Sequence, residues 1–249
     1  MMAFALSIER LEQASRKDGC PICRLEHDSA VQSITAFLWE HANDSTAREP
    51  VNHSYGLCPP HTRLLVASEL SSSGTLPGVH MIYEVLARNA SQELAAAARS
   101  TQKPTIFSRL LPASKRSGHK LLEPSGNCPI CDIAHKSAVN NLSVLYEEIV
   151  KNEELRSIYT QSTGICMQHI RQGNALYSAS HPQAAAFINQ YAADTLQKNR
   201  TDMQEYLRKQ NWEYRDEGLT ADEKTAWLKV LAFFTGLPGK KFTHHIKEF

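Results

Sequence analysis

The 249-residue sequence lacks a long hydrophobic run. Its uncharged N-terminal segment, residues 1–8, is ended by Glu9 and Arg10. A membrane-spanning helix needs about 20 predominantly apolar residues, and a secretory signal needs an apolar segment behind a basic flank. We therefore expect a soluble, cytoplasmic protein without a membrane partner.

An excess of charge of one sign is absent too. The chain has 27 Lys and Arg residues against 26 Asp and Glu residues, for a formal net charge of +1. Binding to nucleic acid depends on a basic surface that neutralises phosphates. The balance of charge therefore does not suggest a nucleic-acid partner, and among macromolecular partners we favour a protein.

Motifs for catalysis and patterns for strands are also missing. The sequence contains no motif that pairs a nucleophile with a general base and no glycine-rich loop that would hold a phosphate. It also contains no pair of acidic residues with the pattern of catalytic carboxylates. Apolar residues recur at steps of three and four, as in amphipathic helices, and no alternating pattern of convincing length occurs. The sequence therefore predicts an all-α fold and gives no positive sign of an enzyme.

The six cysteines all belong to one pattern that occurs twice. Cys20-Pro21-Ile22-Cys23 recurs at residues 128–131, and Gly56-x-Cys58-x-x-His61 recurs at residues 164–169. The offset is 108 residues for both elements, so no gap separates the copies. This agreement predicts the duplication of one unit.

Each copy supplies three cysteines and one histidine, which is a donor set for a tetrahedral zinc ion. Because each copy holds a complete set, we expect each to close its own structural site, with two zinc ions per chain. Four protein ligands also leave no open position for catalysis. The expected sets are Cys20, Cys23, Cys58 and His61 in the first copy and Cys128, Cys131, Cys166 and His169 in the second.

Other uses of the cysteines remain open at this point. An iron–sulfur cluster accepts thiolates and sometimes histidine, and would make the protein an electron carrier or a redox sensor. A redox dithiol would leave Cys58 and Cys166 unexplained, and unligated buried thiols are a further alternative. Three cysteines cannot all pair within one copy, so a disulfide framework would need a bridge between copies.

Four residues near the expected ligands are candidates for a supporting role. His27 and His135 follow the second cysteine of each CxxC by four residues. Each is interpreted as a core histidine or a hydrogen-bond partner of a ligand, with a replacement ligand and a proton-transfer group as alternatives. Arg63 and Arg171 lie two residues beyond the CxxH histidines and could offset the negative charge of a Cys3His zinc site.

The sequence is expected to consist of four consecutive segments, of which two contain the repeats. Residues 101–127 are interpreted as a basic linker, either a solvated tether or a docking strip that includes Lys115, Arg116 and Lys120. We expect helices to open at Pro21 and Pro129, because proline suits a first helical turn. Loose connections are expected at residues 43–55 and 152–163. The segments are residues 1–100 (first repeat), 101–127 (linker), 128–218 (second repeat with a long helix) and 219–249 (capped C-terminal helix and tail).

The paired CPxC and GxCxxH elements resemble an uncharacterised prokaryotic family known as a domain of unknown function. The similarity extends from about Cys20 to Pro238 and includes residues 214–217 and the helix that bears Trp227. It implies that the cysteine and CxxH positions are metal ligands. It implies no activity, and His27 and His135 are not part of its pattern.

Overall fold

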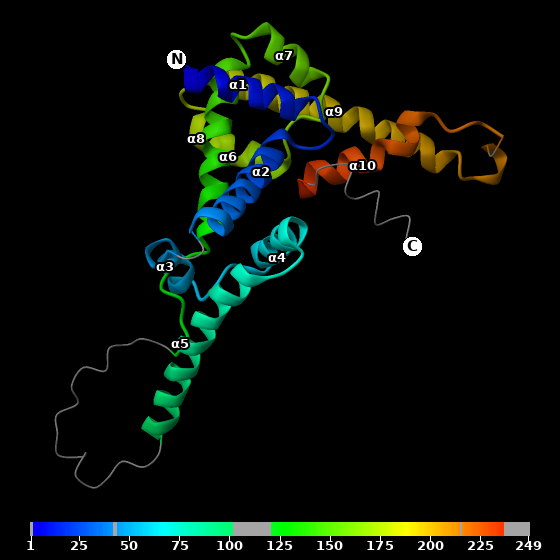
Figure 1. The fold of residues 1–249 in the computed structure, drawn as a ribbon. Coiled ribbons are helices and arrows are strands. Elements are labelled where there is room, and N and C mark those ends of the chain that lie inside the picture. The colour runs from blue at the N-terminus through cyan, green and yellow to red at the C-terminus, as the bar shows by residue number, and fades with distance from the viewer. Residues whose placement is uncertain (1, 42–43, 102–120, 215, 237–249) are drawn as a thin grey trace. The chain divides into compact units, whose positions relative to one another are not determined.

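The computed structural model describes residues 2–41, 44–101, 121–214 and 216–236, and these residues form helices joined by short connections, as Figure 1 shows. No strand occurs among them, so the all-α fold is confirmed. Within the same ranges, no helix combines the length and the apolar character that crossing a bilayer would require.

The chain divides into two compact units, and one of them combines the N-terminal and C-terminal parts of the sequence. Unit 1 consists of Met1–Asp28 and His135–Phe249, and unit 2 consists of Ser29–Ala134. Both boundaries fall inside long helices, α2 (Pro21–Ala36) and α6 (Pro129–Glu148). The first part of α2 therefore belongs to unit 1 and the first part of α6 to unit 2.

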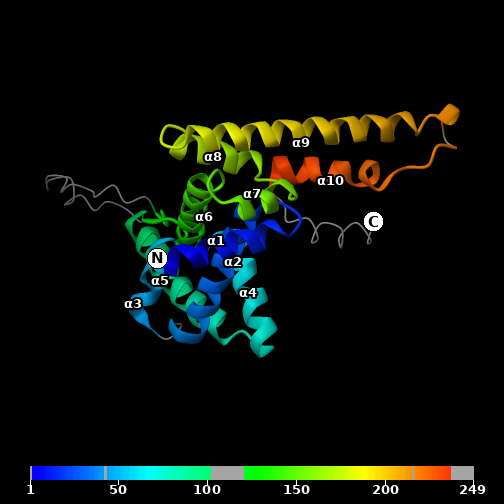
Figure 2. The same ribbon diagram turned by 90° about the horizontal axis from the view of Figure 1, so that it is seen from above.

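Unit 1 is built mainly from helices of the second half of the chain. Helices α9 and α10 run side by side in both views (Figures 1 and 2), and α1 contacts α7. The unit contains α1 (Met2–Ser15), α7 (Glu153–Thr160), α8 (Met167–Tyr177), α9 (Pro182–Arg208), the short 3₁₀-helix η3 (Trp212–Tyr214) and α10 (Ala221–Thr235).

A core of fully buried apolar side chains holds unit 1 together. Leu11 of α1, Leu142 and Leu145 of α6, and Ile188 of α9 are all fully buried in it. The same cluster includes Cys20 and Cys166, so the cysteine-bearing loops are packed against the core rather than lying on the surface. Burial of this apolar area is the main stabilising contribution to the unit.

Unit 2 has a smaller core of its own. Ile34, Leu65 and Ile82 are its largest fully or nearly fully buried members, and they come from three different helices. The helices that lie wholly in this unit are the π-helix η1 (Phe37–His41), α3 (Ser45–His53), α4 (Pro59–Ser73) and α5 (Pro77–Thr101).

Several local expectations are confirmed. Helices α2 and α6 begin at Pro21 and Pro129, and α10 begins with the capping box that Thr220 and Glu223 form. Helix α10 ends at Gly236, which adopts a left-handed conformation.

The expectation of loose connections at residues 43–55 and 152–163 is wrong, because α3 and α7 occupy these segments. Each begins at a side-chain cap, Asp44 for α3 and Asn152 for α7. The linker cations Lys115, Arg116 and Lys120 lie outside the described residues. The division of the sequence into repeats and linker stays a prediction.

Candidate metal centres

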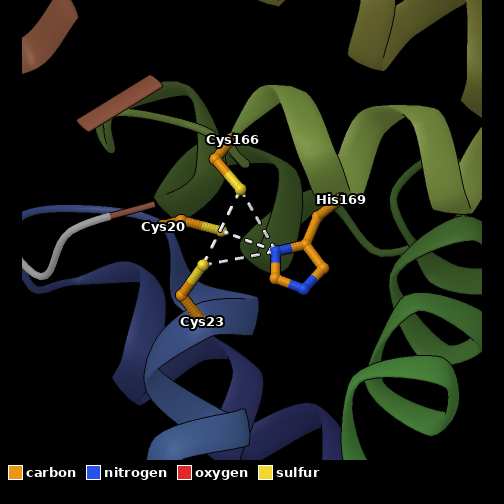
Figure 3. A group of neighbouring side chains, drawn as sticks. All are labelled: Cys20, Cys23, Cys166 and His169. Carbon is orange, nitrogen blue, oxygen red and sulfur yellow. Dashed lines mark hydrogen bonds between the residues drawn. The ribbon is translucent and has the colours of Figure 1, made fainter. Parts of the chain in front are cut away.

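Unit 1 brings four candidate ligands together from two distant segments. Cys20 and Cys23 lie at the start of α2, and Cys166 and His169 lie at the start of α8. Nδ1 of His169 lies 3.5 Å from Sγ of Cys20, 3.4 Å from Sγ of Cys23 and 3.2 Å from Sγ of Cys166. Figure 3 shows the three sulfur atoms turned toward this nitrogen. We call this group cluster 1.

Unit 2 contains a second group of the same composition, cluster 2. Cys58 caps α4 and is followed by His61 in its first turn, while Cys128 and Cys131 lie at the start of α6. Nδ1 of His61 lies 3.1 Å from Sγ of Cys58, 3.6 Å from that of Cys128 and 3.4 Å from that of Cys131. In each cluster all four ligand atoms lie within 4.8 Å of one another, so each could hold a metal ion.

The expectation that each copy closes its own site is wrong, because the clusters exchange their ligand pairs. Cys20 and Cys23 meet Cys166 and His169, and Cys58 and His61 meet Cys128 and Cys131. The physical reason is that a rigid helix, α2 or α6, begins at each CxxC and carries the following chain away from it. The CxxH element of the same copy therefore lies far from that CxxC. The 16 residues of α2 carry the chain about 24 Å along the helix axis.

All four ligand-bearing elements use the start of a helix. The unpaired amide groups and the helix dipole there favour a thiolate over a thiol. Gly56 and Gly164 precede Cys58 and Cys166 by two residues, with φ of 99° and 70°. Only glycine adopts such values readily, which explains its place in the repeated motif.

Contacts among the thiols of cluster 1 shift their pKa values in opposite directions. Hydrogen bonds from Cys20 and Cys23 lower the pKa of Cys166, and the contact with Cys166 raises the pKa of Cys23. Burial alone would lower the pKa of His169, but hydrogen bonds with Cys166 and Cys20 and the nearby carboxylate of Glu26 raise it to about 11. Three ionised thiolates this close repel one another, and a bound cation would relieve that repulsion.

The two clusters differ in how far they are covered. Cys20 and Cys166 are each 2% exposed and His169 is 1% exposed, whereas Cys131 of cluster 2 is exposed. Gly236, at the end of α10, lies directly against cluster 1. A Cβ atom at this glycine would come within 2.6 Å of Sγ of Cys23. Cluster 1 therefore lies under the backbone at the end of α10.

Cluster 1 also has an acidic neighbour that sequence reasoning missed. Oε2 of Glu26 lies 3.6 Å from Nε2 of His169, the ring nitrogen that faces away from the sulfurs. A carboxylate in this position orients a ligand histidine and raises its basicity. The sequence did contain a signal for this contact, because Glu26 lies one helical turn after Cys23. The matching position of the second copy is Ala134, so cluster 2 has no carboxylate there.

The four residues expected to support the sites lie on the surface. His27, His135, Arg63 and Arg171 are all exposed, and neither histidine belongs to a cluster. The interpretation of His27 and His135 as core histidines is therefore wrong. The close approach of Gly236 to Cys23 could not be read from the sequence.

Comparison with known proteins finds a family match but no characterised relative. No curated protein and no solved structure matches the chain. Residues 4–235 match the model of a family described as "Family of unknown function (DUF6062)". Because the match includes both clusters and nearly the whole sequence, the chain belongs to this family.

Proposed function

We propose that the chain binds one zinc ion in each Cys3His cluster, that both ions are structural, and that the protein acts by binding another protein. The observation that carries the metal proposal is the convergence of eight cysteine and histidine side chains into two groups of four. In both groups the histidine directs Nδ1 at three sulfurs, as ligands of one shared metal ion would.

Distances within the clusters favour a single tetrahedral ion. With zinc–sulfur bonds of about 2.3 Å, tetrahedral angles place two sulfur ligands about 3.8 Å apart. The Sγ atoms of Cys23 and Cys166 are 3.7 Å apart, and those of Cys58 and Cys131 are 3.5 Å apart. An iron–sulfur cluster distributes its protein ligands over more than one iron, which separates them more widely.

A structural role follows from the number and origin of the ligands. Each site has four protein ligands, so a bound zinc ion would keep no open position for substrate. Each site also joins two segments that are far apart in the sequence, 149 residues for Cys20 and His169 and 73 residues for Cys58 and Cys131. Metal binding would therefore contribute directly to the folding of each unit.

Exposed apolar side chains support a role in protein binding. Leu207 at the end of α9 is 66% exposed and Trp212, in the connection to α10, is 75% exposed. Aromatic residues are enriched at protein interfaces, where a few of them supply most of the binding energy. At the offset of 108 residues, α9 corresponds to α5 of the first copy, whereas α10 follows the second copy.

Elemental analysis of protein purified without oxygen tests the metal proposal. We expect a colourless protein with about two zinc ions per chain, a value set by the two Cys3His groups. X-ray absorption at the zinc edge should give three sulfurs and one nitrogen per ion. Brown protein with iron and acid-labile sulfide would contradict the proposal and establish the iron–sulfur alternative.

Substitution of the exposed apolar residues tests the binding role. Trp212→Ser with Leu207→Ser should abolish co-purification of a partner that the unaltered chain retains, without a change in melting temperature or metal content. Trp39→Ser is the matched control, because Trp39 is 70% exposed but lies in unit 2. Equal loss of the partner in both variants would argue against a specific surface at the end of α9.

A further inference from the structure

Unit 1 contains a cavity of about 440 Å³ that is lined by polar and charged residues. Residues 15–18 and 160–163 form part of its wall, together with α9 and Lys229 of α10. The first segment leads directly into Cys20, and the second leads into Cys166 through Gly164 and Ile165. The two loops that present the ligands of cluster 1 thus also enclose this cavity.

Unit 2 contains a cavity at the corresponding place. It has a volume of about 220 Å³, and its wall includes Asn52, His53, Tyr55, Glu123 and Ser125. A shift of 108 residues places these side chains at positions 160, 161, 163, 15 and 17, all of which line the cavity of unit 1. The cavity is therefore a feature of both units, and it is larger in unit 1.

The basic side chains of the larger cavity are specific to unit 1. Arg16, Lys17 and Lys198 line it, and the matching positions of the other copy hold Pro124, Ser125 and Ala90. The fourth cation, Lys229, comes from α10, which follows the second copy. Asp18 and Asp194 also replace uncharged residues, Gly126 and Leu86, but four cations against two carboxylates line the cavity. This excess of positive charge points to recognition of negative charge.

Carboxylates near this cavity partly balance its cations. Asp222 lies 3.2 Å from Nζ of both Lys198 and Lys229, so one carboxylate holds two ammonium groups together. Arg16 pairs at 3.8 Å with Glu154, and both side chains are mostly exposed, which makes this pair weak. Asp18 and Asp194 also line the cavity and could accept hydrogen bonds from a ligand.

Two buried polar atoms at the wall lack a hydrogen-bond partner among the described residues. Asn199 is only 3% exposed; its Nδ2 donates to the carbonyl oxygen of Thr195, but its Oδ1 accepts no bond. The hydroxyl of Thr163 is likewise buried and unpaired. An unsatisfied buried acceptor destabilises the folded state, and a ligand donor would remove that cost.

We propose that the cavity of unit 1 binds a small organic anion that also carries hydroxyl or amino groups. Lys17, Lys198 and Lys229 attract the anionic group, which is a phosphate or a carboxylate. The hydroxyl or amino groups donate to Oδ1 of Asn199. The volume lies at the lower end of the range for ligand sites, about 300–1,000 Å³, so the ligand is a small molecule.

Calorimetric titration of the full chain with three small probes tests the proposal. Glycerol 3-phosphate represents the phosphates, glycerate the carboxylates, and glycerol the neutral parent. We expect saturable binding of one anion per chain by at least one charged probe and no binding of glycerol. The tighter of the two charged probes identifies the anionic group. Failure of both charged probes, or equal binding of glycerol, would overturn the proposal.

Charge-reversed variants locate the binding. Lys17→Glu and Lys229→Glu should each lower the affinity for the charged probe by about tenfold or more, because each removes a charge-assisted contact. Lys224→Glu is the matched control, since Lys224 is exposed on the same helix as Lys229 but does not line the cavity. Equal weakening by Lys224→Glu would show a general charge effect and contradict the site.

Asn199→Leu tests the second half of the recognition. It should weaken binding of glycerol 3-phosphate but leave binding of inorganic phosphate unchanged, because only the former has alcohol hydroxyl groups that can donate to Oδ1 of Asn199 while its phosphate stays with the lysines. An unchanged melting temperature would separate this effect from a loss of fold. Equal losses for both probes would contradict the role given to Asn199.

Discussion

Clusters 1 and 2 contain the same four residue types at the same spacing, but their surroundings differ. Cluster 1 is buried, lies under the backbone at Gly236 and has Glu26 beside its histidine. Cluster 2 has an exposed cysteine, Cys131. Since the repeated motif is the same, the difference comes from residues outside it: α10 and the position occupied by Glu26 or Ala134. Duplicated sites can therefore diverge in burial and in neighbouring groups without any change in their ligands.

Loss of a ligand should give the largest effect. Cys166→Ser is expected to lower the metal content by one ion per chain and to destabilise unit 1 by several kcal/mol, because metal binding is part of its folding free energy. Cys58→Ser should do the same to unit 2 but less severely, since cluster 2 is less buried. Chemical denaturation with metal analysis measures both. Unchanged unfolding after complete removal of metal would contradict a structural role.

Removal of the carboxylate beside His169 should have a smaller effect, confined to cluster 1. Glu26→Ala is expected to weaken metal binding there by about 10–100-fold, the usual effect of losing a group that orients a ligand histidine. Competition with a chromophoric chelator measures the affinity. Asp28→Ala is the control, because Asp28 is exposed on the same helix. Equal weakening in the two variants would contradict a specific role for Glu26.

The cover of cluster 1 can be tested at two helix ends with similar backbones. Gly236 and Gly74 have φ of 72° and 69°, but only Gly236 has atoms within 4 Å of an added Cβ. Gly74→Ala should cost about 1–2 kcal/mol from left-handed strain alone. Gly236→Ala should cost about 1–3 kcal/mol more, because Cβ would overlap Sγ of Cys23. Thermal unfolding measures both changes, and equal costs would show that Gly236 does not press on the cluster.

The smallest expected difference between the two clusters is kinetic and needs no substitution. It is the order in which the cysteines of the unaltered protein react with an alkylating reagent. Brief treatment with iodoacetamide is expected to label Cys131 first, because alkylation requires access to the sulfur. Cys20 and Cys166 should react last. Peptide mass spectrometry after timed quenching gives the order. Early labelling of Cys166 would mean that cluster 1 opens more readily than its burial indicates.

The sequence contained enough information for the helices and the ligand residues but not for the pairing. Spacing and proline predicted the starts of α2 and α6, and the repeat singled out the eight residues that the clusters contain. Two CxxC and two CxxH elements can pair in two ways with identical spacing, and the direction in which α2 and α6 carry the chain decides between them. The contact of Gly236 with Cys23 depends on long-range packing, which no local pattern encodes.

The exchange of ligand pairs has a consequence for the order of events during synthesis. Cys20 and Cys23 leave the ribosome first, but their partners Cys166 and His169 follow only after the whole of unit 2. When residues 1–100 have emerged, the chain holds Cys20, Cys23, Cys58 and His61, which form a complete but non-native Cys3His set. A metal ion captured at that moment would have to be released before either native cluster could form. We therefore expect early metal to slow folding, although late metal stabilises the finished protein.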